Sequence, residues 1–214
     1  MNKVRIMCLL VIVAIFFGAF PSLTNAQVQN LPKVSVLPDS PFYFLVSIGE
    51  QLSVFLTPGG SGKAKQEMLL ADTRLAESYA LLMKRKPSDV LTVLEKYEEY
   101  VLHITERLRR ETGRGLETDQ MVSIISERFY PQQMTLADLY VISPEQIQPA
   151  VFLAMQTSKD AYKKAITYLS PDQQGNLMRN TAAVKEQTLQ YISNLRIQGN
   201  DLPYFPLEIE QDAF

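Results

Sequence analysis

The chain has 214 residues, with 21 lysines and arginines against 23 aspartates and glutamates, and a formal net charge of −2. This mild acidity is not typical of a protein that binds nucleic acid. One histidine, one cysteine and no tryptophan are present, so neither a histidine-rich metal site nor an internal disulfide is expected, and we predict no cofactor.

The first 26 residues have the three-part pattern of a secretory signal peptide. Lys3 and Arg5 form a basic start, residues 6–20 are apolar, and Thr24-Asn25-Ala26 offers a cleavage site. The apolar stretch would form about 22 Å of helix, which is shorter than the roughly 30 Å hydrocarbon core of a bilayer. We therefore expect cleavage after Ala26 and a secreted or periplasmic chain that does not cross the membrane. The alternative is an uncleaved N-terminal anchor with the domain outside.

The remainder is predicted to be one all-α domain. Hydrophobic spacing is helical over residues 38–197, with a linker at 27–37 and an irregular tail at 198–214. Short connections favour antiparallel neighbours, so we expect an elongated antiparallel bundle of five to six helices.

The first helix is expected to begin at Ser40 as N-cap, with Pro41 in the first turn. Its apolar stripe follows three- and four-residue steps: Phe42, Leu45, Ile48, Leu52 and Phe55. Pro58-Gly59-Gly60 ends it, and a second helix is predicted from about Lys63 to Lys86. The third helix begins after Pro87 and has a heptad-like seam, which suits packing at a shallow angle: Val90, Leu94, Tyr97, Val101, Ile104 and Leu108.

A fourth helix is expected within residues 117–141, interrupted at Pro131. Two later boundaries share one pattern, Ser143-Pro144-Glu145-Gln146 and Ser170-Pro171-Asp172-Gln173. Each places serine at the N-cap, proline next and glutamine at the third helical position. Both are therefore predicted to form capping boxes that start the fifth and sixth helices.

The glycine-rich segment before Lys63 superficially resembles a phosphate-binding loop. That motif needs glycine where this chain has Thr57 and a hydroxyl where it has Ala64, and it follows a strand. The segment here follows a helical pattern instead. We interpret it as a turn between two helices and expect no nucleotide.

Titratable residues give no clear catalytic arrangement. His103 has no identifiable nucleophile to activate and is interpreted as a histidine at the bundle edge. Glu95, Glu98 and Glu99 resemble a solvated acidic helix face. We therefore predict a non-enzymatic protein.

Two segments are candidate partner-binding sites. Arg107, Arg109 and Arg110 form a basic patch that could meet an anionic surface, although such residues also commonly end a helix. Tyr204 and Phe205 lie in the tail, where apolar side chains can bind a partner or dock on the chain's own bundle. Docking on the bundle is favoured, because termini are ordered only when contacts hold them.

The opening of the domain, Leu37-Pro38-Asp39-Ser40-Pro41-Phe42-Tyr43, and the later Arg74-Leu75-Ala76-Glu77 resemble a bacterial domain of unknown function. Its members are exported or membrane-attached, begin with a Leu-Pro-x-Ser-Pro-aromatic-Tyr segment and continue with a helix of Arg-Leu-Ala-Glu type. The resemblance covers roughly residues 37–110. This chain departs from it with Val46-Ser47, where members often carry Lys-Arg, and with a glycine-rich turn in place of an acidic one. The resemblance implies export and helicity, and no catalytic residue.

Our leading hypothesis is an exported interaction or scaffold domain of the cell envelope, with a protein partner or self-association. The alternative is an ATP-independent periplasmic-type chaperone or envelope stress sensor. It draws on a weaker similarity of residues 142–146 and 169–174 to the Leu-Thr-x-x-Gln repeats of such proteins.

Overall fold

The computed structural model describes residues 31–114, 118–199 and 202–208. The described residues form six α-helices and no strand: α2 (Tyr43–Leu56), α3 (Gly60–Met83), α4 (Pro87–Gly113), α5 (Asp119–Ile142), α6 (Gln148–Ile166) and α7 (Pro171–Ile197). The predicted all-α bundle of five to six helices is thus confirmed. The predicted signal peptide, residues 1–26, lies outside the described residues, as do 200–201 and 209–214 of the tail.

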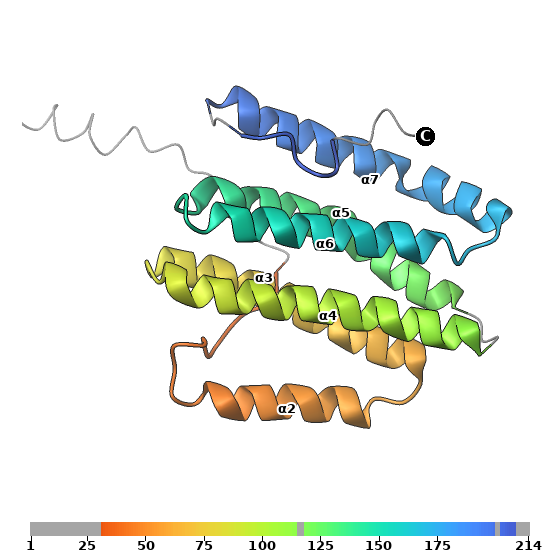
Figure 1. Ribbon diagram of the computed structural model, residues 1–214, viewed down its shortest axis with the longest axis horizontal. Helices are drawn as coiled ribbons and strands as arrows, with labels where there is room; N and C mark the ends of the chain where they lie inside the picture. The colour runs from red at the N-terminus through yellow and green to blue at the C-terminus, as the bar shows by residue number, and fades with distance from the viewer. Residues whose placement is uncertain (1–30, 115–117, 200–201, 209–214) are drawn as a thin grey trace, which may run out of the picture.

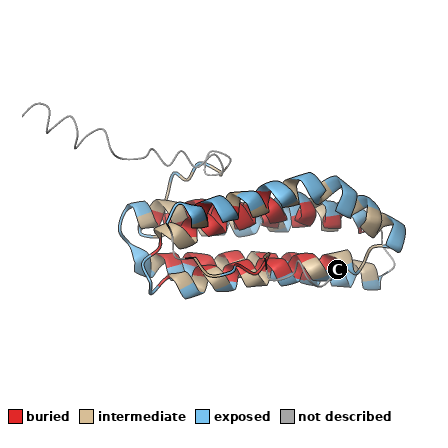
Figure 2. Ribbon diagram, turned by 90° about the horizontal axis from the view of Figure 1, so that it is seen from above, coloured by how far each residue is buried: buried red, intermediate tan, exposed pale blue. Residues whose placement is uncertain are grey.

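Four helices form the core. α3, α4, α6 and α5 each pack against two of the others, while α2 lies against α3 at one edge and α7 against α5 at the opposite edge (Figure 1). Viewed from above, the helices form two layers, and the buried residues of each layer face the other layer (Figure 2). No helix of residues 31–208, the masked positions apart, has the length and apolar character needed to cross a bilayer.

The seam of α4 lies at the centre of this core, as its spacing predicts. All six seam residues are buried, with Leu94, Tyr97 and Leu108 fully inaccessible. Between α5 and α6, Phe129 stacks on Tyr162 with ring centroids 4.2 Å apart.

A buried polar network joins α3, α4 and α5. The Gln132 amide nitrogen donates to Asp72 at 2.8 Å, and its oxygen accepts from the Tyr97 hydroxyl at 3.0 Å. Burial raises the pKa of Asp72 despite this hydrogen bond. Through Gln132, the network links α5 to both α3 and α4.

The prediction that Pro131 interrupts the fourth helix is wrong, because α5 runs through it. Proline removes one backbone hydrogen bond from a helix interior. Here the neighbours Tyr130 and Gln132 are both buried, and the Gln132 network ties the helix to its surroundings. Tertiary packing therefore outweighs the local cost.

Only one of the two predicted capping boxes forms. At Ser170 both reciprocal bonds are present: Gln173 N donates to Ser170 Oγ at 3.4 Å, and Ser170 N donates to the Gln173 side chain at 2.9 Å. The prediction for Ser143 is wrong, because α6 begins only at Gln148 with no side-chain cap. A start at Pro144 would place Pro149 inside the helix, whereas the observed start places it in the first turn, where its missing N–H costs nothing.

α2 begins later than predicted, and α3 begins earlier. Ser40 Oγ accepts from Phe42 N at 3.3 Å, but α2 begins at Tyr43. α3 starts at Gly60, after Gly59 takes a φ of 74°. It ends before Arg85, whose φ is 57°, with Lys86 N bonded to Leu81 O and Arg85 N to Leu82 O. This is a Schellman ending, so Lys84, Arg85 and Lys86 form the turn rather than the last helical residues.

The described part of the tail docks on the bundle, as favoured. Phe205 is fully buried and meets Tyr140 edge to face, with ring centroids 5.3 Å apart. Arg196 of α7 forms an ion pair with Glu208 at 2.9 Å.

Candidate functional site

α2 presents its apolar residues to solvent. Phe44, Leu45, Ile48, Leu52, Phe55 and Leu56 are 52–75 % exposed, and Phe42, directly before the helix, is 65 % exposed. At 3.6 residues per turn, the six helical positions fall within an arc of roughly 120°. We call these seven residues the outer face of α2. The face has no charged residue, because the only charge in α2 is Glu50.

The opposite face of α2, which is turned to the bundle, is largely polar. Tyr43 is the only buried residue of the helix, and its hydroxyl donates to Glu77 Oε2 at 3.0 Å. Two turns further along, Glu50 forms an ion pair with Arg74, and Ser53 Oγ accepts from Gln66 at 3.1 Å. α2 is therefore an amphipathic helix whose polar face packs on the protein and whose apolar face points away from it.

Arg74 is the centre of these contacts. Its side chain is fully buried, pairs with Glu77 at 2.7 Å and with Glu50, and lies 5.7 Å from the ring centroid of Tyr43. Removing a charge from water is costly unless partners compensate it. Arg74 therefore links α2 to α3 through Glu50, while Glu77 of its own helix is its second partner.

The two carboxyl groups titrate near neutral pH. Burial raises the pKa of Glu50 to about 7, with a further contribution from the charge of Glu77. Burial also raises the pKa of Glu77 to about 7, and the positive charges of Arg74 and Lys96 oppose this increase. The attachment of α2 thus depends on groups that change charge in the physiological range.

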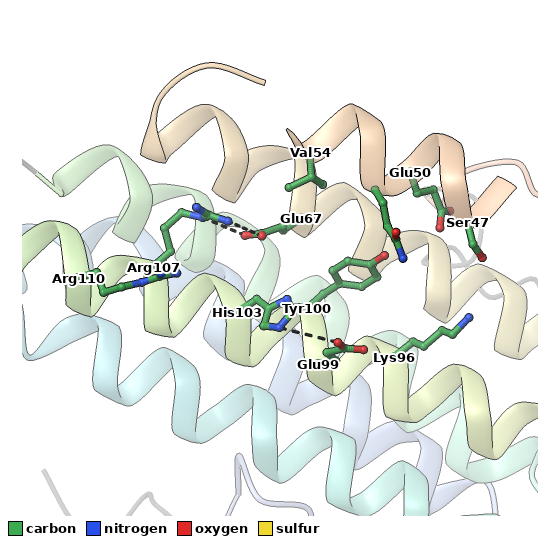
Figure 3. Close-up of a pocket in the computed structure, with 11 residues that line it drawn as sticks. Ser47, Glu50, Val54, Glu67, Lys96, Glu99, Tyr100, His103, Arg107 and Arg110 are labelled. Carbon is green, nitrogen blue, oxygen red and sulfur yellow. Dashed lines mark hydrogen bonds and ion pairs between the residues drawn. The ribbon is translucent and has the colours of Figure 1, made fainter. Parts of the chain in front are cut away.

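A cleft of about 490 Å³ lies between α2, α3 and α4 (Figure 3). Its lining is rich in charged side chains, and two pairs of them contact each other. Arg107 holds Glu67 through two hydrogen bonds of 2.6 and 3.2 Å, and His103 Nε2 lies 3.8 Å from Glu99. Lys96 Nζ lies 5.0 Å from the Tyr43 ring centroid. Among the described residues, no three His, Cys, Asp or Glu side chains are grouped to hold a metal ion.

The predicted basic patch is divided by these pairings. Arg107 is turned into the cleft by Glu67, whereas Arg109 is exposed and bonded twice to Glu106, at 2.7 and 2.8 Å. Arg110 lies 3.9 Å from the same carboxylate. Only Arg107 and Arg110 line the cleft.

The two tail candidates have opposite environments. Phe205 is inaccessible beneath the tail, while Tyr204 is 71 % exposed, with the Arg196 guanidinium 5.0 Å from its ring centroid. Neither residue lines the cleft, because Tyr204 lies beside α7 and Phe205 against Tyr140 of α5.

Sequence reasoning did not identify Glu50, Arg74 and Glu77 as a cluster. A usable signal was present, since Tyr43, Ser47, Glu50 and Ser53 recur at three- and four-residue steps and form a polar stripe opposite the apolar one. The Arg-Leu-Ala-Glu segment contains the other two members of the cluster, Arg74 and Glu77. Its tertiary partner could not be read from a single sequence.

Together these features define an all-α protein in which a four-helix core carries a peripheral amphipathic helix with its apolar face outward. The chain belongs to the family described as Domain of unknown function (DUF5667), whose model matches residues 35–146, just over half of the chain. The expected membership of a domain-of-unknown-function family is confirmed, whereas the bacterial origin and the opening motif remain predictions. No curated protein matches the chain, and neither does any solved structure. The matched region contains α2 to α5, and therefore the whole of the cleft and the outer face of α2.

Proposed function

We propose that the protein is an exported, non-enzymatic interaction domain of the cell envelope that binds through the outer face of α2. One observation carries this proposal: six large apolar side chains share one uncharged face of α2 and Phe42 lies directly before it, all seven more than half exposed. Soluble monomers rarely expose contiguous apolar patches larger than a few hundred Å². A face of this size is suited to being covered in the working protein.

The cleft supports binding over catalysis. Arg107 pairs with Glu67, and His103 faces Glu99 and forms no hydrogen bond with Ser47, the serine of the cleft. The N-terminal sequence pattern supports export, and the family membership agrees with a protein of uncharacterised function.

Site-specific photo-crosslinking in intact cells tests the proposal. A photoreactive residue replaces Phe55 on the outer face, and a matched one replaces Leu153, which is 55 % exposed on α6. We expect adducts at position 55 well above those at position 153, identified by mass spectrometry. If position 55 forms no adduct with lipid, with a second copy or with another protein, the proposal is wrong.

The same exposed face also fits the alternative, a chaperone that shields apolar segments of unfolded clients. A chaperone would suppress aggregation of several unrelated clients without ATP and would lose this activity on Phe44→Ser with Phe55→Ser. A scatter of unrelated protein adducts in cells would favour this function. One recurring adduct would favour the interaction domain.

A further inference from the structure

We infer that the outer face of α2 lies on an anionic membrane surface, with its apolar side chains at the acyl-chain boundary and the basic residues at both helix ends beside lipid phosphates. The inference rests on the proposed function and names what covers the face.

The outer face has the composition of an interfacial helix. It contains three phenylalanines, three leucines and one isoleucine, flanked by the uncharged Gly49 and Gln51. The 14 residues of α2 measure about 21 Å, too short to span a bilayer but sufficient to lie along its surface. Helices of this kind bind membranes through buried apolar area and attraction to anionic lipids.

The inner contacts hold the apolar face outward. Turning α2 about its axis to bury Phe44, Leu52 and Phe55 would remove Tyr43 from Glu77 and Glu50 from the buried Arg74. The orientation is therefore set by a polar cluster within the protein, and the apolar face must be covered from outside.

The surroundings of the N-terminal end of α2 are basic. Lys86 Nζ pairs with Asp39 Oδ2 at 2.6 Å, which places the Lys84–Lys86 turn beside the start of α2. Lys84 and Arg85 are exposed and form no ion pair with any residue in the described ranges. Asp39 and Asp89 are the carboxylates that act on this turn, through Lys84 and Lys86, so three positive charges face two negative ones and this end keeps a net positive charge.

The surroundings of the C-terminal end of α2 are basic as well. A depression of about 460 Å³ beside Gly59 and Gly60 is lined by Lys63, Arg107, Arg110 and Arg114, against one carboxylate, Glu111. Glu111 is already 3.7 Å from Arg114, and Arg107 is held by Glu67. Lys65, one turn into α3, is exposed. Although the whole chain has a net charge of −2, both ends of α2 are positive.

This charge distribution distinguishes a membrane from a second copy. Two outer faces packed antiparallel would bring the Lys84–Lys86 turn of one copy to the Lys63 end of the other, and parallel packing would bring identical ends together. Positive charge would oppose positive charge in both arrangements, which destabilises an interface. Anionic headgroups compensate both ends at once.

The chain has no tryptophan, so a single introduced tryptophan reports on its own surroundings. The full chain with Phe55→Trp is reconstituted into vesicles of phosphatidylcholine with or without phosphatidylglycerol, and brominated acyl chains serve as quencher. The control is Leu153→Trp on α6, at a position that is also more than half exposed. We expect blue-shifted emission and bromine quenching at position 55, stronger in the anionic vesicles, and water-like emission at position 153.

Three outcomes would overturn the inference. Water-like emission at position 55 means that the face remains in solvent. A blue shift without quenching means that protein covers it, a second copy included. Equal quenching at positions 55 and 153 means that the whole molecule, not α2, meets the lipid. Because the readout is local, insertion of the N-terminal apolar segment does not imitate it.

A charge variant tests the headgroup contacts. In the Phe55→Trp chain, Lys84→Gln with Arg85→Gln should reduce the vesicle-bound fraction of α2, with an affinity loss on the order of tenfold. Arg179→Gln, at an exposed position of α7, is the control and should have no effect. An unchanged quenching signal would contradict the role of these two charges. If the vesicle experiments fail but position 55 forms protein adducts in cells, the membrane inference is wrong and the proposed function stands. If no adduct forms either, both are wrong.

Discussion

The Tyr43 hydroxyl and the Arg74 guanidinium meet at one atom, Oε2 of Glu77, at 3.0 and 2.7 Å respectively. Tyr43 belongs to the opening segment of the domain, and Glu77 follows 34 residues later on α3. The two sequence segments that prompted the family resemblance are therefore the two halves of one structural contact. Their shared role is to attach α2 to the bundle.

Replacing Tyr43 with phenylalanine should loosen α2. The change removes one hydrogen bond to a buried carboxylate, which is worth about 1.5 kcal/mol. Amide hydrogen exchange should become about tenfold faster in α2 while the protection of α4 stays unchanged. Tyr204→Phe, at an exposed position, is the control. Unchanged exchange in α2 would show that Tyr43 does not hold the helix.

The stability of the protein should fall as pH rises from about 4.5 to about 7. Glu50 and Glu77 both have pKa values raised to about 7 from an ordinary 4.5. In this range the folded state holds more protons than the unfolded state, so the free energy of unfolding decreases with pH. Lys96 and Arg74 oppose the effect without removing it.

Urea unfolding at about pH 4 and about pH 8, on either side of that range, measures this dependence. Glu50→Gln with Glu77→Gln should flatten the pH profile. Asp138, whose pKa burial raises to about 6, should account for part of the slope that remains. A double variant with the slope of the parent would contradict the assignment.

The two serines of the repeated Ser-Pro pattern should behave differently. Ser170→Ala removes a complete capping box and should cost about 1 kcal/mol of unfolding free energy. Ser143→Ala should cost almost nothing, because Ser143 Oγ is buried with no hydrogen-bond partner among the described residues. Chemical denaturation of both variants makes this comparison. Equal losses would mean that Ser143 has a role that its surroundings do not explain.

Tail docking rests on Phe205. Phe205→Ala should destabilise the protein by about 3 kcal/mol, because a fully buried aromatic ring is removed from its contact with Tyr140. Tyr204→Ala, at an adjacent but exposed position, should change stability by less than about 0.5 kcal/mol. Thermal unfolding distinguishes the two. Similar melting temperatures for both variants would show that the tail contributes little to the fold.

Most of the helices and the core seam of α4 follow from local properties of the chain. Apolar residues at three- and four-residue steps specify a helix and its buried side when one stripe is apolar and the other charged, as from Val90 to Leu108. Proline in the first turn, and Ser170 with Gln173, mark helix starts through interactions within a few residues of the chain. These features need no knowledge of neighbouring elements.

Contacts between distant residues decided the rest. The Gln132 network maintains α5 through Pro131, and Pro149 favours a start of α6 at Gln148 over one directly after Ser143. The apolar stripe of α2 is regular in the sequence, yet it faces solvent because Arg74, buried on another helix, requires Glu50 and Glu77 as partners. Periodicity specifies that a helix has two faces. Which face is buried depends on the free energy of pairing across the fold, and here a buried charge outweighed an apolar stripe.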